Sequence, residues 1–475
     1  MTTTTSTSDK PPLPALFKPT LILHGGAGAI HRSTLPPDLY AQYHASLLKY
    51  LRSTRALLES GASALDAAVH AVSLMEDDPL FNCGRGSVFT AAGTIEMEAS
   101  LMVCSVNPAH PFEVGIIKRG AGVMGLRNVR HPIQLAREVL VRSGRKDGRR
   151  HGGAGGGGGG EDEDDRGSMH SQLVGPYVED VLARQWGLEF KPDEWFFTQR
   201  RWEEHLRGLR GEAETVTMSQ GTVGCVCLDQ GGGLAVATST GGLTNKLPGR
   251  IGDTPTLGAG FWAEAWEEKG EEEVVRSGGE EMWYGRAEVG IEDRVKKGIW
   301  DMTLGDCLPG MVREGVDWMY GSLRSTEDEA SWNHEAWSEK ERLMAQKKRS
   351  RRAVAVSGTG NGDSFLRTAA ARTACAISRF STPNLSLAEA VAAVAGPRGE
   401  LQRSAGDRWG LTGEGQGGII GIEAELDESV TNGGELKQGK VVFDFNCGGL
   451  WRAWMEDIGD GKEVERVMVF KDEYK

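Results

Sequence analysis

The chain has 475 residues and a formal net charge of −13, with 39% hydrophobic and 25% charged residues, which is typical of a globular protein with one large core or two ordinary ones. The net negative charge argues against a nucleic-acid-binding protein, because no basic field would hold the phosphates. No run of about 18 apolar residues is present, so the sequence predicts no membrane-spanning helix.

The N-terminal segment and the cysteines bear on the compartment. Segment 1–20 lacks the basic and apolar regions of a signal peptide. The cysteines are scattered and odd in number, which favours reduced thiols over disulfides. We therefore expect a cytoplasmic protein. Cys225 and Cys227 form a C-x-C pair, but no other Cys or His pair stands near, so we interpret them as small buried apolar residues rather than metal ligands.

Strands and helices alternate in the predicted first half. An apolar strand at 21–23 runs into His24-Gly25-Gly26-Ala27-Gly28, which we interpret as a glycine-rich bend that brings the backbone close to another group. Ser63 is a capping residue followed three positions later by Asp66, and apolar residues then recur at helical spacing. The other elements predicted here are helices at 38–59, after Pro132 and at 171–186, and strands at 95–103 and 113–118.

Two polar segments interrupt the pattern, at about 144–168 and about 265–350. The first includes GGAGGGGGG and cannot bury enough apolar surface to order itself, and the second is charged and irregular. We expect both to be insertions. The basic run Lys347–Arg352 resembles a nuclear address, with a solvated loop as the alternative interpretation.

The second half predicts mainly strands. Strands at 222–228 and 234–239 flank DQGGG, whose turn chemistry predicts a hairpin. A strand at 353–356 precedes SGTGNGD and a helix, and further strands are predicted at 417–423 and 441–445. So many strands, with helices in both halves, favour two packed sheets flanked by helices.

Threonine, glycine and aspartate gather at the ends of these strands. Thr222 opens one strand, Thr240 ends its hairpin partner, and Thr359 ends a third. Arg250 and Asp253 lie on the loop after the hairpin. Each feature alone is more typical of an ordinary turn, but the combination at these spacings points to a function.

The segment GTVGCVCLDQGGGLAVATSTGGLTNKLPGRIGDTPTLGAGFWAE resembles the nucleophile region of the plant-type L-asparaginases, also called isoaspartyl peptidases. These N-terminal-nucleophile hydrolases are made as precursors that cut themselves before a threonine. The resemblance continues in LILHGGAG, LMEDDPLFNCGRGSVFTAAGTIEMEASLM, VRHPIQLAREVL and FDFNCGGLWRAW. It implies an α+β fold, a four-layer αββα sandwich, with an alpha chain, 1–221, and a beta chain, 222–475.

The implied cut between Gly221 and Thr222 would supply the base that a threonine nucleophile needs. A threonine hydroxyl is a weak nucleophile unless a base takes its proton. Cleavage would free the α-amine of Thr222, which has a pKa of about 7.7–8.0 and can act as that base. Gly221 tolerates strained dihedral angles that other residues resist.

The resemblance also implies roles for other residues. Thr240 would support Thr222, and the Thr359 hydroxyl with the Gly360 N–H would form the oxyanion hole. Arg250 would pair with the α-carboxylate of the substrate. The remaining implied roles are the α-ammonium site of Asp253 and the Gly362 carbonyl, a position near the active site for Asn82, and the His24-Gly25-Gly26 turn beside the scissile bond.

The expected activity is hydrolysis of the side-chain amide of asparagine or of β-aspartyl peptides, with release of L-aspartate through a β-aspartyl ester on Thr222. The resemblance implies a dimer of alpha/beta heterodimers. It implies no organic cofactor, and a structural sodium ion held by backbone carbonyls in the loop Leu74–Cys83.

Several alternatives stay open. T-G-N-G-D at Thr359–Asp363 resembles glycosylasparaginase rather than the T-G-H-G-E of isoaspartyl peptidases, whereas Gly221-Thr222 and T-S-T-G-G favour the isoaspartyl peptidases. Threonine aspartase, a protein-cutting branch, lacks the Arg–Asp pair. A non-catalytic scaffold and a phosphate-binding loop are the alternatives outside the family, although no G-x-G-x-x-G or P-loop Lys-Ser is present.

Overall fold

Two β-sheets carry most of the regular structure in the computed structural model, which describes residues 14–114, 119–142, 170–212, 221–268, 350–427, 436–459 and 462–474. Residues Met1–Glu268 and Ser350–Lys475 form one compact unit, to which all the described residues belong. The 144–168 insertion and residues 269–349 of the second insertion lie outside the described residues.

The larger sheet has eight strands in the order β14-β13-β2-β6-β7-β3-β4-β5. Its neighbours are antiparallel except for β4 and β5, which are parallel. The strands are β2 (Thr20–Gly28), β3 (Met97–Ser105), β4 (Gly120–Leu126), β5 (Gln172–Val174), β6 (Val223–Leu228), β7 (Gly233–Thr240), β13 (Gly449–Asp457) and β14 (Glu463–Met468).

The smaller sheet has four antiparallel strands in the order β12-β10-β9-β8. They are β8 (Phe261–Glu268), β9 (Ser350–Gly360), β10 (Gly417–Asp427) and β12 (Lys440–Phe445). A short parallel pair joins β1 (Phe17–Lys18) to β11 (Lys437–Gln438).

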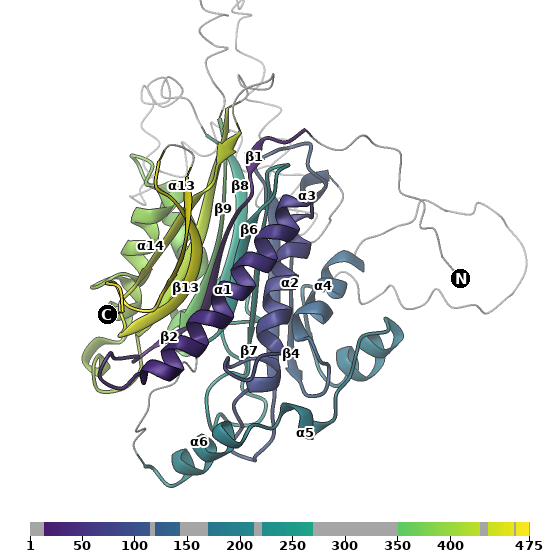
Figure 1. Ribbon diagram of the computed structural model, residues 1–475, viewed down its shortest axis with the longest axis vertical. Helices are drawn as coiled ribbons and strands as arrows, with labels where there is room; N and C mark the ends of the chain where they lie inside the picture. Colours follow the sequence, from purple (N-terminus) through teal and green to yellow (C-terminus); the bar gives the residue numbers. More distant parts are fainter. Residues whose placement is uncertain are drawn as a thin grey trace, which may run out of the picture. The chain divides into compact units, whose positions relative to one another are not determined.

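Helices pack on the outer faces of the two sheets. On the larger sheet these are α1 (Pro37–Glu59), α2 (Ala64–Glu76) and α4 (Pro132–Arg142), and on the smaller sheet α13 (Ala370–Phe380) and α14 (Leu387–Ala395). Figure 1 shows α1 and α2 on one side of the strands and α13 and α14 on the other. The other helices are α3 (Pro111–Val114), α5 (Asp193–Phe196), α6 (Gln199–Leu209), α12 (Gly362–Thr368), α15 (Glu400–Ser404), a π-helix (Tyr177–Ala183) and 3₁₀ turns at Gly84–Gly86 and Gly406–Arg408.

Strand alternation divides the interior into three apolar cores. Leu21 and Leu23 of β2 join the core beneath α1, α2 and α4, while Ile22 between them points to the core shared by the sheets. Val354 and Val356 of β9 pack against α13 and α14. The predicted α+β class is confirmed.

The helices and the hairpin with the strongest local signals are confirmed. The helix predicted at 38–59 is α1, and α2 begins after Ser63, whose side chain accepts a hydrogen bond from the Asp66 backbone N–H. The helix after Pro132 is α4, and β6 and β7 form the predicted hairpin.

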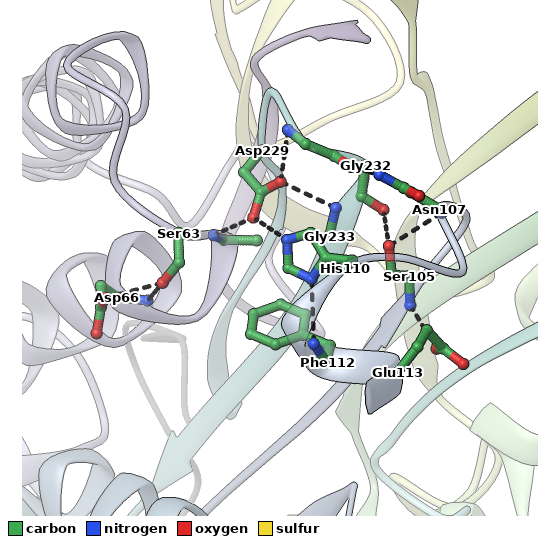
Figure 2. Close-up of polar contacts among 12 residues, drawn as sticks. Ser63, Asp66, Ser105, Asn107, His110, Phe112, Glu113, Asp229, Gly232 and Gly233 are labelled. Atoms are coloured by element: carbon green, nitrogen blue, oxygen red, sulfur yellow. Dashed lines mark hydrogen bonds and ion pairs between the residues drawn. The ribbon is translucent and has the colours of Figure 1, made fainter. Parts of the chain in front are cut away.

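Asp229 fixes the turn of that hairpin (Figure 2). Its Oδ1 accepts from the backbone N–H groups of Gly231 and Gly233 at 3.0 and 2.9 Å. Its Oδ2 accepts from Ala64 N in the first turn of α2 at 2.9 Å and lies 3.4 Å from His110 Nε2. The turn of the hairpin is therefore tied to the N-terminus of α2.

The glycine-rich bend predicted after residue 23 is wrong, because β2 continues to Gly28. The strand pairs with β13, and the register shifts between Trp451, which pairs with Gly26, and Arg452, which pairs with His24. Gly26 has a φ of 109°, which favours glycine. A Cβ at Gly25 would lie 2.6 Å from the Phe81 ring. These glycines therefore serve a bulged, closely packed strand.

Other boundaries also differ from the predictions. In the strand predicted at 113–118, residues 113 and 114 belong to the helix α3 and residues 115–118 lie outside the described residues. The strand β4 begins at Gly120. The helix predicted at 171–186 is divided into β5 and the π-helix, with Pro176 between them, because proline cannot donate a backbone hydrogen bond. The strand at 441–445 is not the last, since β13 and β14 follow.

The second insertion is shorter than predicted at both ends. Residues 265–268 belong to β8, and β9 begins at Ser350. In the basic run Lys347–Arg352, residues 347–349 lie outside the described residues. Arg351 forms an ion pair with Glu113, and Arg352 is buried in an ion pair with Glu423, so this end of the run is neither a solvated loop nor an exposed address.

Two negative findings apply to the described ranges. No helix there is long and apolar enough to cross a bilayer. No group of three or more His, Cys, Asp or Glu side chains there is arranged to hold a metal ion. Cys225 and Cys227 are buried free thiols with sulfur atoms 3.4 Å apart.

Candidate active site

The face of the larger sheet that meets the smaller one is apolar along most of its length and polar at one end. Its apolar part includes Ile22, Val226, Val236 and Met102. Every second residue of a strand points to the same face. Beyond Val236, β7 therefore presents Thr238 and Thr240 on this face, and β3 presents Ser100 and Glu98, which pair with them.

Strand β9 of the smaller sheet repeats this change. Ala353 and Ala355 lie in the shared core, and Ser357 and Thr359 follow on the same face. The Ser357 hydroxyl lies 2.6 Å from His24 Nε2 of the opposite sheet. Gly224 leaves the room for this contact, because a Cβ there would collide with both groups. The two polar ends therefore meet.

Thr222 stands directly before β6 at this polar end and is buried. Its hydroxyl oxygen lies 3.0 Å from the hydroxyl oxygen of Thr254. The pairing of Val223 with Ser239 places Thr240 opposite Thr222, and the Thr240 hydroxyl accepts a hydrogen bond from Gly242 N at 3.0 Å. The hydroxyl contact of Thr222 in this structure is thus with Thr254, which the sequence analysis missed although it directly follows Asp253.

The Gly221–Thr222 peptide bond lies between the two sheets. A Cβ at Gly221 would lie 2.5 Å from the Thr359 hydroxyl oxygen and 2.6 Å from Ala27 N. Ala27 N itself donates to the Thr359 hydroxyl at 3.1 Å. Thr359 and the glycine-rich part of β2 are therefore next to the predicted cleavage site.

His24 is wholly buried behind Thr222. Burial lowers the pKa of His24 to about 3, and a hydrogen bond with the Thr222 backbone opposes that shift. The imidazole is therefore uncharged at neutral pH. Its neighbour Ser357 is a second residue that the sequence analysis missed, two positions before Thr359 on the same face of β9.

Thr359 and Gly360 end β9. Gly360 has a φ of 149°, and a Cβ there would collide with the Gln416 carbonyl oxygen, so only glycine fits. Asn361 follows as the N-cap of α12, and its Oδ1 accepts from Ser364 N at 3.0 Å. The asparagine of T-G-N-G-D is therefore engaged in capping a helix.

Arg250, Asp253 and Gly362 form a second part of the site. Arg250 Nη2 lies 3.0 Å from Asp363 Oδ1. A Cβ at Gly362 would lie 2.5 Å from Asp253 Oδ1 and 2.9 Å from Arg250 Nη2, so the glycine touches both groups. Burial, and next the charge of Glu98, raise the pKa of Asp253 to about 7.

Asn82 joins two loops beside this site. Its Nδ2 donates to the Gly242 carbonyl at 2.8 Å, and its own carbonyl accepts from Gly241 N at 2.9 Å. Its Oδ1 accepts from Val88 N at 3.1 Å. Asn82 thereby holds the segment that follows Thr240.

The segment Leu74–Cys83 contains the last turn of α2 and the loop after it. The carbonyl oxygens of Glu76 and Phe81 press against Gly84 and Gly86 on the inside of this loop. Backbone carbonyl oxygens are ligands of the kind that hard cations take. The carbonyls of Pro79 and Leu80 instead accept hydrogen bonds from Arg200.

Comparison with known proteins bears on the family of this chain. A family model described as asparaginase matches residues 17–146 and 166–267. The isoaspartyl peptidase of Salmonella typhimurium is 37% identical over 256 residues, covering 52% of this chain and 70% of the relative. The chain belongs to the asparaginase family. This confirms the resemblance found in the sequence, and the family is one of N-terminal-nucleophile hydrolases.

Two further relatives of the asparaginase family illustrate the range. The isoaspartyl peptidase of Escherichia coli is 36% identical over 256 residues, covering 52% of this chain and 68% of its own length. The isoaspartyl peptidase/L-asparaginase of Danio rerio is 33% identical over 249 residues, covering 52% and 67%. The asparaginase match passes over residues 147–165, within the predicted glycine-rich insertion.

Proposed function

We propose that this chain is a self-cleaving threonine amidohydrolase that hydrolyses the side-chain amide of L-asparagine or of β-aspartyl peptides. The observation that carries the proposal is the buried Gly221–Thr222 bond, which lies against Thr359 while the Thr222 hydroxyl contacts Thr254. The relatives named isoaspartyl peptidase and L-asparaginase support the same chemistry.

Self-cleavage begins with attack of the Thr222 hydroxyl oxygen on the carbonyl carbon of Gly221. The hydroxyl proton of Thr222 passes to the peptide nitrogen as the C–N bond breaks, and the nitrogen becomes the free α-amine of Thr222. Water then hydrolyses the ester, which restores the Thr222 hydroxyl and leaves a carboxylate on Gly221. The hydroxyl of Thr359, which lies against Gly221, donates to the oxyanion in this proposal.

Amide hydrolysis uses the same atoms. The freed α-amine takes the hydroxyl proton of Thr222 as its oxygen attacks the side-chain carbonyl carbon of the substrate, and gives that proton to the leaving amine. The Thr359 hydroxyl and Gly360 N–H stabilise the tetrahedral oxyanion. Water then releases aspartate from the ester.

Recognition uses Arg250 and Asp253, which lie on one loop and both touch Gly362. A guanidinium suits a free α-carboxylate, and a carboxylate suits a free α-ammonium. A substrate that carries both groups on one carbon is an amino acid joined through its side chain. An internal α-peptide does not fit, because both groups are tied up in its chain.

Glycosylasparaginase is the alternative favoured by T-G-N-G-D. The engagement of Asn361 in capping α12 gives this asparagine a structural role and weakens the alternative. Threonine aspartase is disfavoured by the presence of Arg250 and Asp253.

We further infer a four-layer αββα arrangement, divided into chains 1–221 and 222–475, with two such pairs in a dimer. The three cores, one between the sheets and one outside each, support the layers. We also propose that the carbonyls of Glu76 and Phe81 hold a structural sodium ion.

The test is cleavage of the purified protein. We expect the wild type to convert to fragments 1–221 and 222–475 with Thr222 as the new N-terminus, and Thr222→Ala to stay intact and inactive because it lacks the nucleophile. N-terminal sequencing checks the position. A different new terminus, or cleavage of Thr222→Ala, contradicts the mechanism.

The substrate is tested on the cleaved enzyme by comparing kcat/KM for β-aspartyl-leucine, L-asparagine and N-acetylglucosaminyl-asparagine. We expect one of the first two to be preferred. A preference of about tenfold or more for the glycosylated substrate, or 1.4 kcal/mol in transition-state binding, overturns the substrate assignment but leaves the Thr222 mechanism standing.

A further inference from the structure

Glu98 is a buried carboxylate at the start of β3 that the proposed chemistry does not use. Its side chain is 1% exposed. Its Oε1 accepts a hydrogen bond from Gly252 N at 2.9 Å. Among the described residues, neither its Oε2 nor Asp253 Oδ2 has a hydrogen-bond partner. Two buried carboxylate oxygens without donors indicate a place for a cationic ligand.

The two carboxylates flank one guanidinium. A Cβ at Gly252 would lie 3.0 Å from Glu98 Oε2 and 2.8 Å from Arg250 Nη1. A Cβ at Gly362 would lie 2.5 Å from Asp253 Oδ1 and 2.9 Å from Arg250 Nη2. Glu98 therefore belongs to the same pocket as the predicted α-carboxylate and α-ammonium sites.

The charged groups around Glu98 and Asp253 influence which of these two carboxyl groups carries a proton. Burial raises the pKa of Glu98, and Lys246 is the leading charge that opposes this shift. For Asp253 the leading charge is Glu98 itself, which raises its pKa further, while Arg250 lowers it. The ionisable groups that face the pair from β3, the loop and α12 are Glu96, Lys246, Arg250 and Asp363.

Two of these groups already have partners. Lys246 donates to the Glu96 carbonyl oxygen at 2.7 Å, and Arg250 is paired with Asp363. Two like charges buried side by side do not both ionise readily. The hydrogen bond from Gly252 N favours the charged form of Glu98, so in the empty site Asp253 is the carboxyl group that keeps a proton.

We propose that Glu98 is a positioning residue that holds Asp253 protonated while the site is empty, so that a substrate ammonium binds in exchange for that proton. The proposal rests on the proposed function. The ligand arrives as R–NH₃⁺ and keeps its three protons, the O–H bond of Asp253 breaks, and the proton passes to solvent. The positive charge of the ligand ammonium replaces the positive charge of the released proton. A ligand without a free ammonium cannot make this exchange.

The sign of the pH dependence follows. Below a pH of about 7 the proton of Asp253 must be displaced, so ligand affinity falls as pH decreases, by up to about tenfold per pH unit. Above that pH Asp253 is already ionised, and this cause of lost affinity is absent. Glu98→Gln keeps an oxygen for Gly252 N but removes the charge, so the pKa of Asp253 decreases and the loss of affinity begins at lower pH.

The experiment measures proton release when L-aspartate binds the cleaved enzyme, by calorimetry at pH 6 in two buffers of different ionisation enthalpy. We expect the wild type to release close to one proton and Glu98→Gln less than half. Glu113→Gln is the matched control, because Glu113 contacts the opposite end of β3, and we expect it to match the wild type. Glu98→Asp keeps the charge and should restore release close to one proton.

The outcomes separate the two proposals. Equal release by the wild type and Glu98→Gln overturns the role of Glu98 and leaves the proposed function intact, because a residue that only held Gly252 would act in this way. Absence of hydrolysis of both L-asparagine and β-aspartyl-leucine by the same wild-type sample overturns the proposed function. Should Glu98→Gln fail to fold, Glu98→Ala replaces it: release of less than half a proton supports the proposal, and release equal to that of the wild type overturns it.

Discussion

At the scale of single residues, the site depends on glycines that leave room for polar groups. Gly224 makes room for the contact between His24 and Ser357, and Gly221 lies against the Thr359 hydroxyl. Ser357 and Thr359 reach these glycines from β9 of the facing sheet, and His24 reaches Gly224 from the neighbouring strand β2. A methyl group at either glycine would displace a hydrogen-bonded side chain, which is why small residues recur at this end of the sheets.

The contact between the hydroxyls of Thr222 and Thr254 makes a prediction at this scale. Thr254→Val keeps the shape of the side chain and removes one hydrogen bond to the nucleophile, worth about 0.5–1.5 kcal/mol. We expect self-cleavage and kcat to fall by up to about tenfold, while Thr254→Ser stays near the wild type. The cleavage time course and kcat test this, and unchanged rates in Thr254→Val would show that the hydroxyl plays no part.

At the scale of elements, the end of β9 and the start of α12 place several groups at once. Thr359 and Gly360 end the strand, Asn361 caps the helix, and Gly362 begins it against Asp253 and Arg250. The chain thus changes from strand to helix within the pocket. A substitution that destabilises the first turn of α12 will therefore also displace Gly362.

Asn361 tests the capping interpretation. Asn361→Ala removes the acceptor for Ser364 N and should lower the free energy of unfolding by about 0.5–2 kcal/mol. Asn361→Ser retains a capping oxygen and should recover most of that loss. Urea unfolding measures the stability, and the ratio of activities on L-asparagine and glycosylated asparagine should be the same in Asn361→Ser and the wild type. A changed ratio would show that Asn361 contacts the substrate.

At the scale of the whole described unit, the space between the sheets has two parts. One end holds the polar groups of the candidate site, and the apolar remainder stabilises the fold. Ile22, Val226 and Val236 are buried in this core. The polar end begins two residues further along each strand. The reacting groups are therefore held by strands anchored in an apolar core, which limits their movement.

The glycine-rich tract gives a prediction at this scale. Residues 152–165 lie within the stretch that the family match passes over. The entropy of closing a loop changes slowly with its length. Deletion of residues 152–165 should therefore alter the free energy of unfolding by less than about 1 kcal/mol and leave self-cleavage and activity unchanged. A Gly-Ser tract of equal length is the control. Loss of folding on deletion alone would contradict the interpretation as an insertion.

The sequence by itself determined the features that depend on neighbouring residues. The cap at Ser63 with its apolar spacing predicted α2, and the DQGGG turn predicted the β6–β7 hairpin, because hydrogen bonds between nearby residues decide both. The family was predicted from the resemblance of the segment that contains Thr222, Arg250 and Asp253 to the plant-type L-asparaginases, because these residues lie close together in the chain.

Only the tertiary structure decided which distant residues meet. Thr254, Ser357 and Glu98 carry no distinctive local pattern, and their places depend on the register of strands far apart in the sequence. The same holds for HGGAG, which suggests a bend locally but is held extended by β13 from the other end of the chain. Pairing between strands is set by burial of both partners, which spacing along one segment does not encode.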